Sequence, residues 1–128
     1  MRQGCWHFAI RRSPIPPPVP MRAVLDTGSF LTCIDAQAFS SLGLPASGQR
    51  TLSTASTGAA LVSCDVYDVS LTIVHPSGNL SLNRTLGFVT VADLPLGPTG
   101  VPALIGCDLL DRWVFVYNGP GRVFSLDY

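Results

Sequence analysis

An aspartate interrupts an apolar stretch early in the chain, in the segment MRAVLDTGSFLTCID, Met21 to Asp35. Three apolar residues, 23–25, lead directly into Asp26, and a second apolar run follows at 30–34. Burying a carboxylate between two such runs is costly unless the group is paired or hydrogen-bonded. Asp26 is therefore either a well-satisfied turn residue or a group whose chemistry is used.

The tripeptide Asp-Thr-Gly that begins at Asp26 is common in turns, so it is by itself a weak indication of catalysis. Its surroundings make the pattern more specific. The turn lies between two expected strands, and a second pattern, Leu104, Ile105 and Gly106, precedes an expected helical turn much later in the chain. The two patterns together favour a catalytic Asp26 over a purely structural one.

The composition favours one β-rich domain. A chain of 128 residues is long enough for a single core, and eleven Pro and twelve Gly indicate many turns. Only 12% of the residues are charged while 47% are hydrophobic, which indicates that a partner covers part of the surface. Eight Arg balance eight Asp, which argues against nucleic acid or an anionic membrane as a partner.

Cysteine spacing and the first residues predict a cytoplasmic protein without metal or other cofactor. The cysteines lack CxxC spacing and lack histidines at ligand spacing. No apolar run approaches the roughly 20 residues of a membrane span, and the first twelve residues make a poor signal peptide. We therefore expect reduced thiols and no membrane partner. The four cysteines are Cys5, Cys33, Cys64 and Cys107.

Two parts are expected along the chain, an arm at 1–20 and a domain at 21–128. The arm contains SPIPPPVP, which favours an extended polyproline conformation. In the domain, strands are expected at 21–26 and 30–34, on either side of the Asp-Thr-Gly turn.

A short helix is expected after the second strand. Asp35 has the position of an N-cap before AQAFSSL, and Gly43 has that of a C-terminal stop. Further along, Val69, Leu71 and Ile73 alternate with polar residues, which predicts a half-buried strand.

The remainder of the chain predicts turns, strands and one helical turn. HPSGN at 75–79 predicts a turn, and 80–91 the partner strand or strands. A short buried strand at 103–106 precedes a helical turn at 108–112, for which Asp108 is the expected N-cap. The segments 113–118 and 122–128 predict a closing hairpin around an Asn-Gly-Pro-Gly turn.

Several segments in this order resemble the retropepsin-like aspartic proteases, the single-domain relatives of pepsin, and in particular their bacterial gag-type branch. The segments are VLDTGSFLTCI, STASTG, VYDVSLTI, ALIGCDLL and FVYNGPGRVFSLDY. The resemblance spans residues 21–128. It implies an all-β acid-protease barrel with one short helix and a C-terminal helical turn, arranged as a two-fold homodimer.

The resemblance also implies a role for each site residue. Asp26 would be catalytic. Thr27 would bond to the partner's loop across the two-fold axis, Gly28 would place its N–H near the carboxylate, and Ser29 would donate to the outer carboxylate oxygen. Leu104, Ile105 and Gly106 would pack beneath this loop. The flap that closes over bound peptide would include Ala55, Ser56, Thr57, Gly58 and Ala59.

The chemistry implied is hydrolysis of peptide bonds by water between two carboxylates. One carboxylate takes a proton from water while the other gives one to the substrate, and neighbouring carboxylates share a proton because both cannot ionise easily. The chain has one Asp-Thr-Gly, so the second carboxylate must be Asp26 of a second copy. The expected partners are therefore the chain itself and a peptide or protein substrate.

Two alternatives remain open from the sequence. The chain is either a protease or a catalytically inactive module of the same fold that dimerises or binds peptides. Where retroviral members have an acidic residue after Asp-Thr-Gly and an Arg after apolar-apolar-Gly, this chain has Phe30 or Leu31 and Cys107, which favours the module. A third reading has a monomeric or differently paired chain in which Asp26 is only structural.

Overall fold

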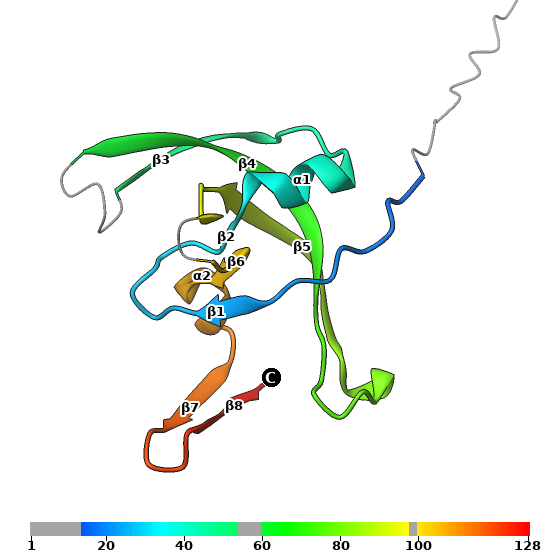
Figure 1. The fold of residues 1–128 in the computed structure, drawn as a ribbon, viewed down its shortest axis with the longest axis vertical. Coiled ribbons are helices and arrows are strands. Elements are labelled where there is room, and N and C mark those ends of the chain that lie inside the picture. The colour runs from blue at the N-terminus through cyan, green and yellow to red at the C-terminus, as the bar shows by residue number, and fades with distance from the viewer. Residues whose placement is uncertain (1–13, 54–59, 98–99) are drawn as a thin grey trace, which may run out of the picture.

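The computed structural model describes residues 14–53, 60–97 and 100–128. Strands make up 44% and helices 14% of these described residues, which confirms the all-β prediction. Figure 1 shows a curled sheet, with a separate hairpin formed by the last strands. In chain order the elements are β1 (Ala23–Leu25), β2 (Cys33–Ile34), α1 (Ala36–Leu42), β3 (Gly48–Ser53), β4 (Leu61–Ile73), η1 (Leu80–Leu82), β5 (Arg84–Asp93), β6 (Ala103–Ile105), α2 (Cys107–Leu110), β7 (Val114–Asn118) and β8 (Val123–Asp127).

The six strands of the sheet follow the order β1-β6-β2-β5-β4-β3. Strand β6 lies between β1 and β2, parallel to the first and antiparallel to the second. The strands on either side of Asp26 therefore pair with β6. Among the described residues, β1 and β3 form the two edges of the sheet and do not pair with each other, so the sheet is curled but open.

The ends of α1 and the alternation of burial in β4 arise from the residues that the sequence indicated. The carboxylate of Asp35 accepts a hydrogen bond from the N–H of Gln37 and caps α1, and Gly43 ends the helix in the left-handed conformation. In β4, Val69, Leu71 and Ile73 are half-buried while the residues between them are exposed, which confirms the predicted alternation.

Two expected strands are shorter in the structure. Strand β2 begins at Cys33, because residues 30–31 turn over the start of α2 instead of joining the sheet. The segment Leu80–Leu82 forms a 3₁₀ turn, and Asn79 caps it by accepting from the N–H of Ser81. The partner strand of β4 therefore begins only at Arg84.

The core consists of two clusters of buried residues, and α1 and α2 both pack into the larger one. Its largest cluster contains Phe39, Val91 and Leu109, and Leu109 is fully buried. The ring of Phe39 stacks on Tyr67 with 3.9 Å between centroids. Full burial of a leucine side chain contributes about 1.5–3 kcal/mol, so the single turn of α2 is held by its core contacts.

The hairpin β7–β8 forms its own two-stranded sheet. Tyr128 joins this hairpin to the rest of the molecule. Its ring contacts Trp113 edge-on at 5.9 Å between centroids, and the guanidinium of Arg84, at the start of β5, lies over it at 5.9 Å. The contact with Arg84 links the end of the hairpin to β5.

Candidate functional site

Asp26 stands at the end of β1, at the start of a loop that leads to β2. Its backbone N–H donates to the carbonyl of Ile105 at 2.9 Å, so the last residue of β6 positions the aspartate directly. The N–H of Gly28 donates to Asp26 Oδ1 at 2.8 Å. The Asp26 side chain is half-buried, whereas Thr27 and Gly28 are exposed. The loop therefore holds a solvent-accessible carboxylate in one orientation.

The far end of this loop is bonded to α2. The N–H of Cys107 donates to the carbonyl of Ser29 at 2.8 Å, and the N–H of Asp108 donates to the carbonyl of Phe30 at 3.1 Å. These N–H groups lie at the start of a helix, where no intrahelical acceptor exists. The loop carbonyls thus accept hydrogen bonds from the free N–H groups at the start of α2, and the same bonds hold the loop in place.

Asp108 is not the N-cap that its position in the sequence suggested. Gly106 is the N-cap of α2, and Asp108 is the second helical residue. The carboxylate of Asp108 accepts from the hydroxyl of Thr32 at 2.8 Å and from the N–H of Leu109 at 3.0 Å. Asp108 therefore fastens α2 to the loop from within the helix.

Thr32 connects the loop, β6 and α2 and was not identified from the sequence. Its side chain is fully buried, accepts from the N–H of Gly106 at 3.1 Å and donates to Asp108. One hydroxyl thus satisfies a buried N–H and a carboxylate. The only signal in the sequence is a threonine inside the otherwise apolar segment FLTCI.

Replacing Thr32 by Val should destabilise the protein, because it keeps the shape of the side chain but leaves the Gly106 N–H without its acceptor and removes one of the two hydrogen bonds that Asp108 Oδ1 accepts. We expect a loss of about 1–3 kcal/mol in the free energy of unfolding, measured in urea. Thr72→Val is the matched control, since that hydroxyl pairs with Thr85 on an exposed face. Equal effects in the two variants would contradict the role of Thr32.

Gly106 is required at its position for steric reasons. A Cβ placed there would lie 2.5 Å from the carbonyl oxygen of Leu31 and 2.6 Å from its carbon. The backbone of the loop therefore rests directly on residue 106. Three contacts bring Leu104–Gly106 against the Asp-Thr-Gly loop. They are the contact of Gly106 with Leu31, the pairing of β1 with β6, and the bond from the Asp26 N–H to the carbonyl of Ile105.

Ser29 forms a different hydrogen bond from the one expected. Its hydroxyl donates to the carbonyl of Leu31 at 2.8 Å rather than to the carboxylate of Asp26. A hydroxyl has one proton to donate, and the carbonyl two residues ahead lies within reach. Ser29 therefore supports the bend of the loop and leaves the orientation of Asp26 to Gly28.

Two cysteines lie close to the loop. Cys107 Sγ donates to the carbonyl of Thr27 at 3.3 Å, so a thiol contacts the loop at the position after apolar-apolar-Gly. Cys33 is buried beneath it, and this burial, with smaller effects from Cys64, Asp108 and Asp26, raises the pKa of its thiol to about 11. Cys33 is therefore a protonated packing residue at neutral pH.

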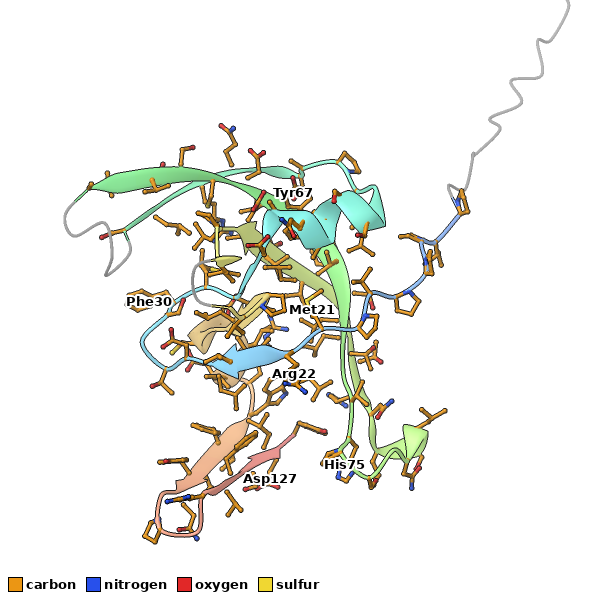
Figure 2. The ribbon with its side chains drawn as sticks, in the orientation of Figure 1. Met21, Arg22, Phe30, Tyr67, His75 and Asp127 are labelled. Carbon is orange, nitrogen blue, oxygen red and sulfur yellow. The ribbon has the colours of Figure 1, made fainter. Side chains whose placement is uncertain are left out.

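The outer bend of the loop carries Phe30, which is 87% exposed. Figure 2 shows this side chain on the loop between β1 and β2, away from the sheet. An aromatic ring gains much from burial, so Phe30 leaves a large apolar side chain exposed on the same loop as Asp26. The expected flap, Ala55, Ser56, Thr57, Gly58 and Ala59, lies outside the described residues, between β3 and β4.

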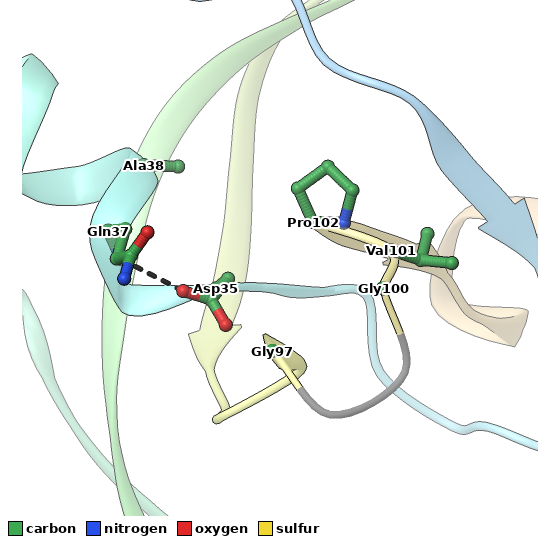
Figure 3. Close-up of a pocket in the computed structure, with 7 residues that line it drawn as sticks. All are labelled: Asp35, Gln37, Ala38, Gly97, Gly100, Val101 and Pro102. Atoms are coloured by element: carbon green, nitrogen blue, oxygen red, sulfur yellow. Dashed lines mark hydrogen bonds between the residues drawn. The ribbon is translucent and has the colours of Figure 1, made fainter.

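Two hollows of the surface lie away from Asp26. Asp35 is one of the residues that line the first, and Figure 3 shows the bond between Asp35 and Gln37. The other oxygen of Asp35 accepts from the N–H of Leu96 at 3.0 Å, so this carboxylate is structural. The residues that line this first hollow are Asp35, Gln37, Ala38, Gly97, Gly100, Val101 and Pro102.

The second hollow includes Asp65 and Asp93. Burial, then the charges of Asp65 and Asp35, raise the pKa of the Asp93 carboxyl. Within the ranges that the structure describes, no three or more His, Cys, Asp or Glu side chains are grouped as metal ligands. No helix in those same ranges is long and apolar enough to cross a membrane.

Comparison of the chain with family models, with curated proteins and with solved structures gives no match. The site is therefore defined by its own geometry: a half-buried aspartate on a loop that β6 and α2 hold through backbone bonds and one buried threonine.

Proposed function

We propose that the chain is an aspartic endopeptidase whose active site forms between two copies, each contributing Asp26. The observation that carries this proposal is the support of Asp26. Its backbone bonds to Ile105, its carboxylate bonds to Gly28, and the loop behind it is fixed on Gly106. A reacting carboxylate has to be held in a fixed position and orientation, and these contacts supply that support.

In the proposed reaction the nucleophile is water. The ionised carboxylate of one copy removes a proton from water as the oxygen attacks the peptide carbonyl, and the protonated carboxyl of the other copy donates to the carbonyl oxygen. The proton taken from water then passes to the departing nitrogen as the C–N bond breaks, and the carboxylate that had donated recovers its proton from the intermediate as the carbonyl re-forms. Because the pair has to hold one proton, the reaction is favoured at mildly acidic pH.

The hairpin β7–β8 supports the dimer that this chemistry requires. Val114, Val116 and Val123 are exposed on one face, and Tyr117 and Phe124 on the other. A two-stranded hairpin is at best marginally stable by itself, and apolar side chains on both of its faces fit a surface that a second copy covers. The hairpin is thus the proposed dimer contact.

Activity should fall faster than linearly on dilution, because the concentration of a dissociating dimer varies with the square of the chain concentration. Initial rates of peptide cleavage and sedimentation velocity, measured over the same concentrations, check this. Val116→Asp should weaken the dimer, so that activity is lost at a higher chain concentration than in the original chain. Val74→Asp, on the β4–β5 hairpin, should leave this concentration unchanged. A strictly linear rate in a monomeric sample would contradict the shared site.

A catalytically inactive peptide-binding module is the second candidate, and the exposure of Phe30 favours it. An apolar contact beside the loop can hold a peptide without any proton transfer. This candidate predicts that Asp26→Asn leaves peptide binding unchanged and that the original chain releases no cleavage products.

A further inference from the structure

The segment that precedes β1 is an apolar arm with a regular pattern of exposure. The described part of the arm, residues 14–20, contains five prolines and no charge. In Figure 1 this part runs from β1 away from the sheet. Proline fixes φ near −65° and disfavours helix at the preceding residue. The arm therefore favours the polyproline II conformation, with three residues per turn.

The burial of the arm follows this period of three. Pro16 and Val19, three residues apart, are half-buried, whereas the two residues between them are exposed. In a helix of three residues per turn, residues at i and i+3 lie on the same edge. The arm thus presents one partly covered edge, formed by Pro16 and Val19, and two outward edges. One outward edge consists of Pro14, Pro17 and Pro20, and the other of Ile15, Pro18 and Met21. All six residues are exposed.

The outward edges expose apolar side chains. Ile15 is 94% exposed and Met21 is 37% exposed. Arg22 follows as an exposed cation (Figure 2). Proline-rich segments form semi-rigid extended spacers, and apolar edges followed by an Arg give this one the further features of a polyproline ligand.

The backbone of the arm restricts how a partner binds it. Proline has no N–H, so the arm cannot join a sheet edge as a regular strand, either on this chain or on a second copy. Recognition of a polyproline helix instead uses a groove lined by aromatic side chains, into which alternate edges of the peptide fit. A helix that is already extended loses little entropy on binding.

We propose that residues 14–22 are a docking segment for a partner domain with an aromatic-lined groove and an acidic rim. Pro17 and Pro20, on one outward edge, enter the groove, and Arg22 faces the rim. This inference is independent of the proposed protease activity, since it uses neither Asp26 nor the loop around it.

The full chain should be titrated into isotope-labelled SH3 and WW domains, whose grooves are of this kind, and observed by NMR. We expect saturable shifts at the groove aromatics of at least one domain. The variant Pro17→Ala/Pro20→Ala should weaken binding at least about tenfold. The matched variant Pro16→Ala/Val19→Ala, on the partly covered edge, should change the affinity less than about threefold.

Equal weakening by the two double variants would overturn the proposed orientation of the arm. The absence of saturable binding by every domain up to about 1 mM would overturn the docking role itself. The Asp26→Asn variant should bind like the original chain, so a failure of the protease proposal and a failure of this one are distinguishable.

Discussion

Replacing Asp26 by Asn should lower kcat/KM for peptide cleavage by at least about 1,000-fold, as is typical when a general acid–base group is removed. The amide is similar in size to the carboxylate and can still accept the bond from the Gly28 N–H. It cannot take a proton from water. The fold should therefore survive while the reaction does not. A peptide library and a denatured protein, incubated between pH 4 and 7, provide the substrates.

The control for this substitution is Asp111→Asn, which makes the same change at an exposed carboxylate at the end of α2. It should leave cleavage unchanged. Thermal unfolding of both variants, compared with that of the original chain, separates lost chemistry from lost structure. Equal cleavage by Asp26→Asn and the original chain would contradict the catalytic role, and so would the absence of cleavage by a folded original dimer.

Replacing Gly106 by Ala should destabilise the protein by about 3 kcal/mol, at the upper end of overpacking effects. The new methyl group would lie 2.5 Å from the carbonyl oxygen of Leu31. Relief requires backbone movement, because the neighbour is not a flexible side chain. That movement would also loosen the bonds that Cys107 and Asp108 make to the loop. Urea unfolding measures the effect.

Gly87→Ala is the matched control for this steric argument. Gly87 lies in β5, and nothing is within 4 Å of the position that its Cβ would occupy. Alanine there should be neutral or stabilising by up to about 1 kcal/mol, because it restricts the unfolded chain. A loss at residue 87 as large as that at residue 106 would show that neither effect arises from contact with Leu31.

The sequence predicted those elements that local chemistry determines. Asp35 and Gly43 mark the ends of α1 because capping depends on a few neighbouring residues. The alternation at Val69, Leu71 and Ile73 gave β4 its inward face. Such signals require no knowledge of the rest of the fold.

The support of the site could not be predicted in the same way, because it depends on distant segments. The insertion of β6 between β1 and β2 joins residues far apart in the chain, and the bond from Gly106 to Thr32 has no local signature. The bond expected of Ser29 came from the family resemblance and the capping role of Asp108 from its neighbours in sequence. In the structure Ser29 donates to the carbonyl of Leu31, and Asp108 accepts from the distant Thr32.

The central claim, that two copies of Asp26 form one active site, is tested most directly by mixing the original chain with Asp26→Asn at constant total concentration. If each active site needs both aspartates and the chains exchange freely, activity should follow the square of the original chain's fraction. An equal mixture then retains about one quarter of the activity. Retention of about one half, in direct proportion to the original chain, would show that each copy works alone and would contradict the shared site.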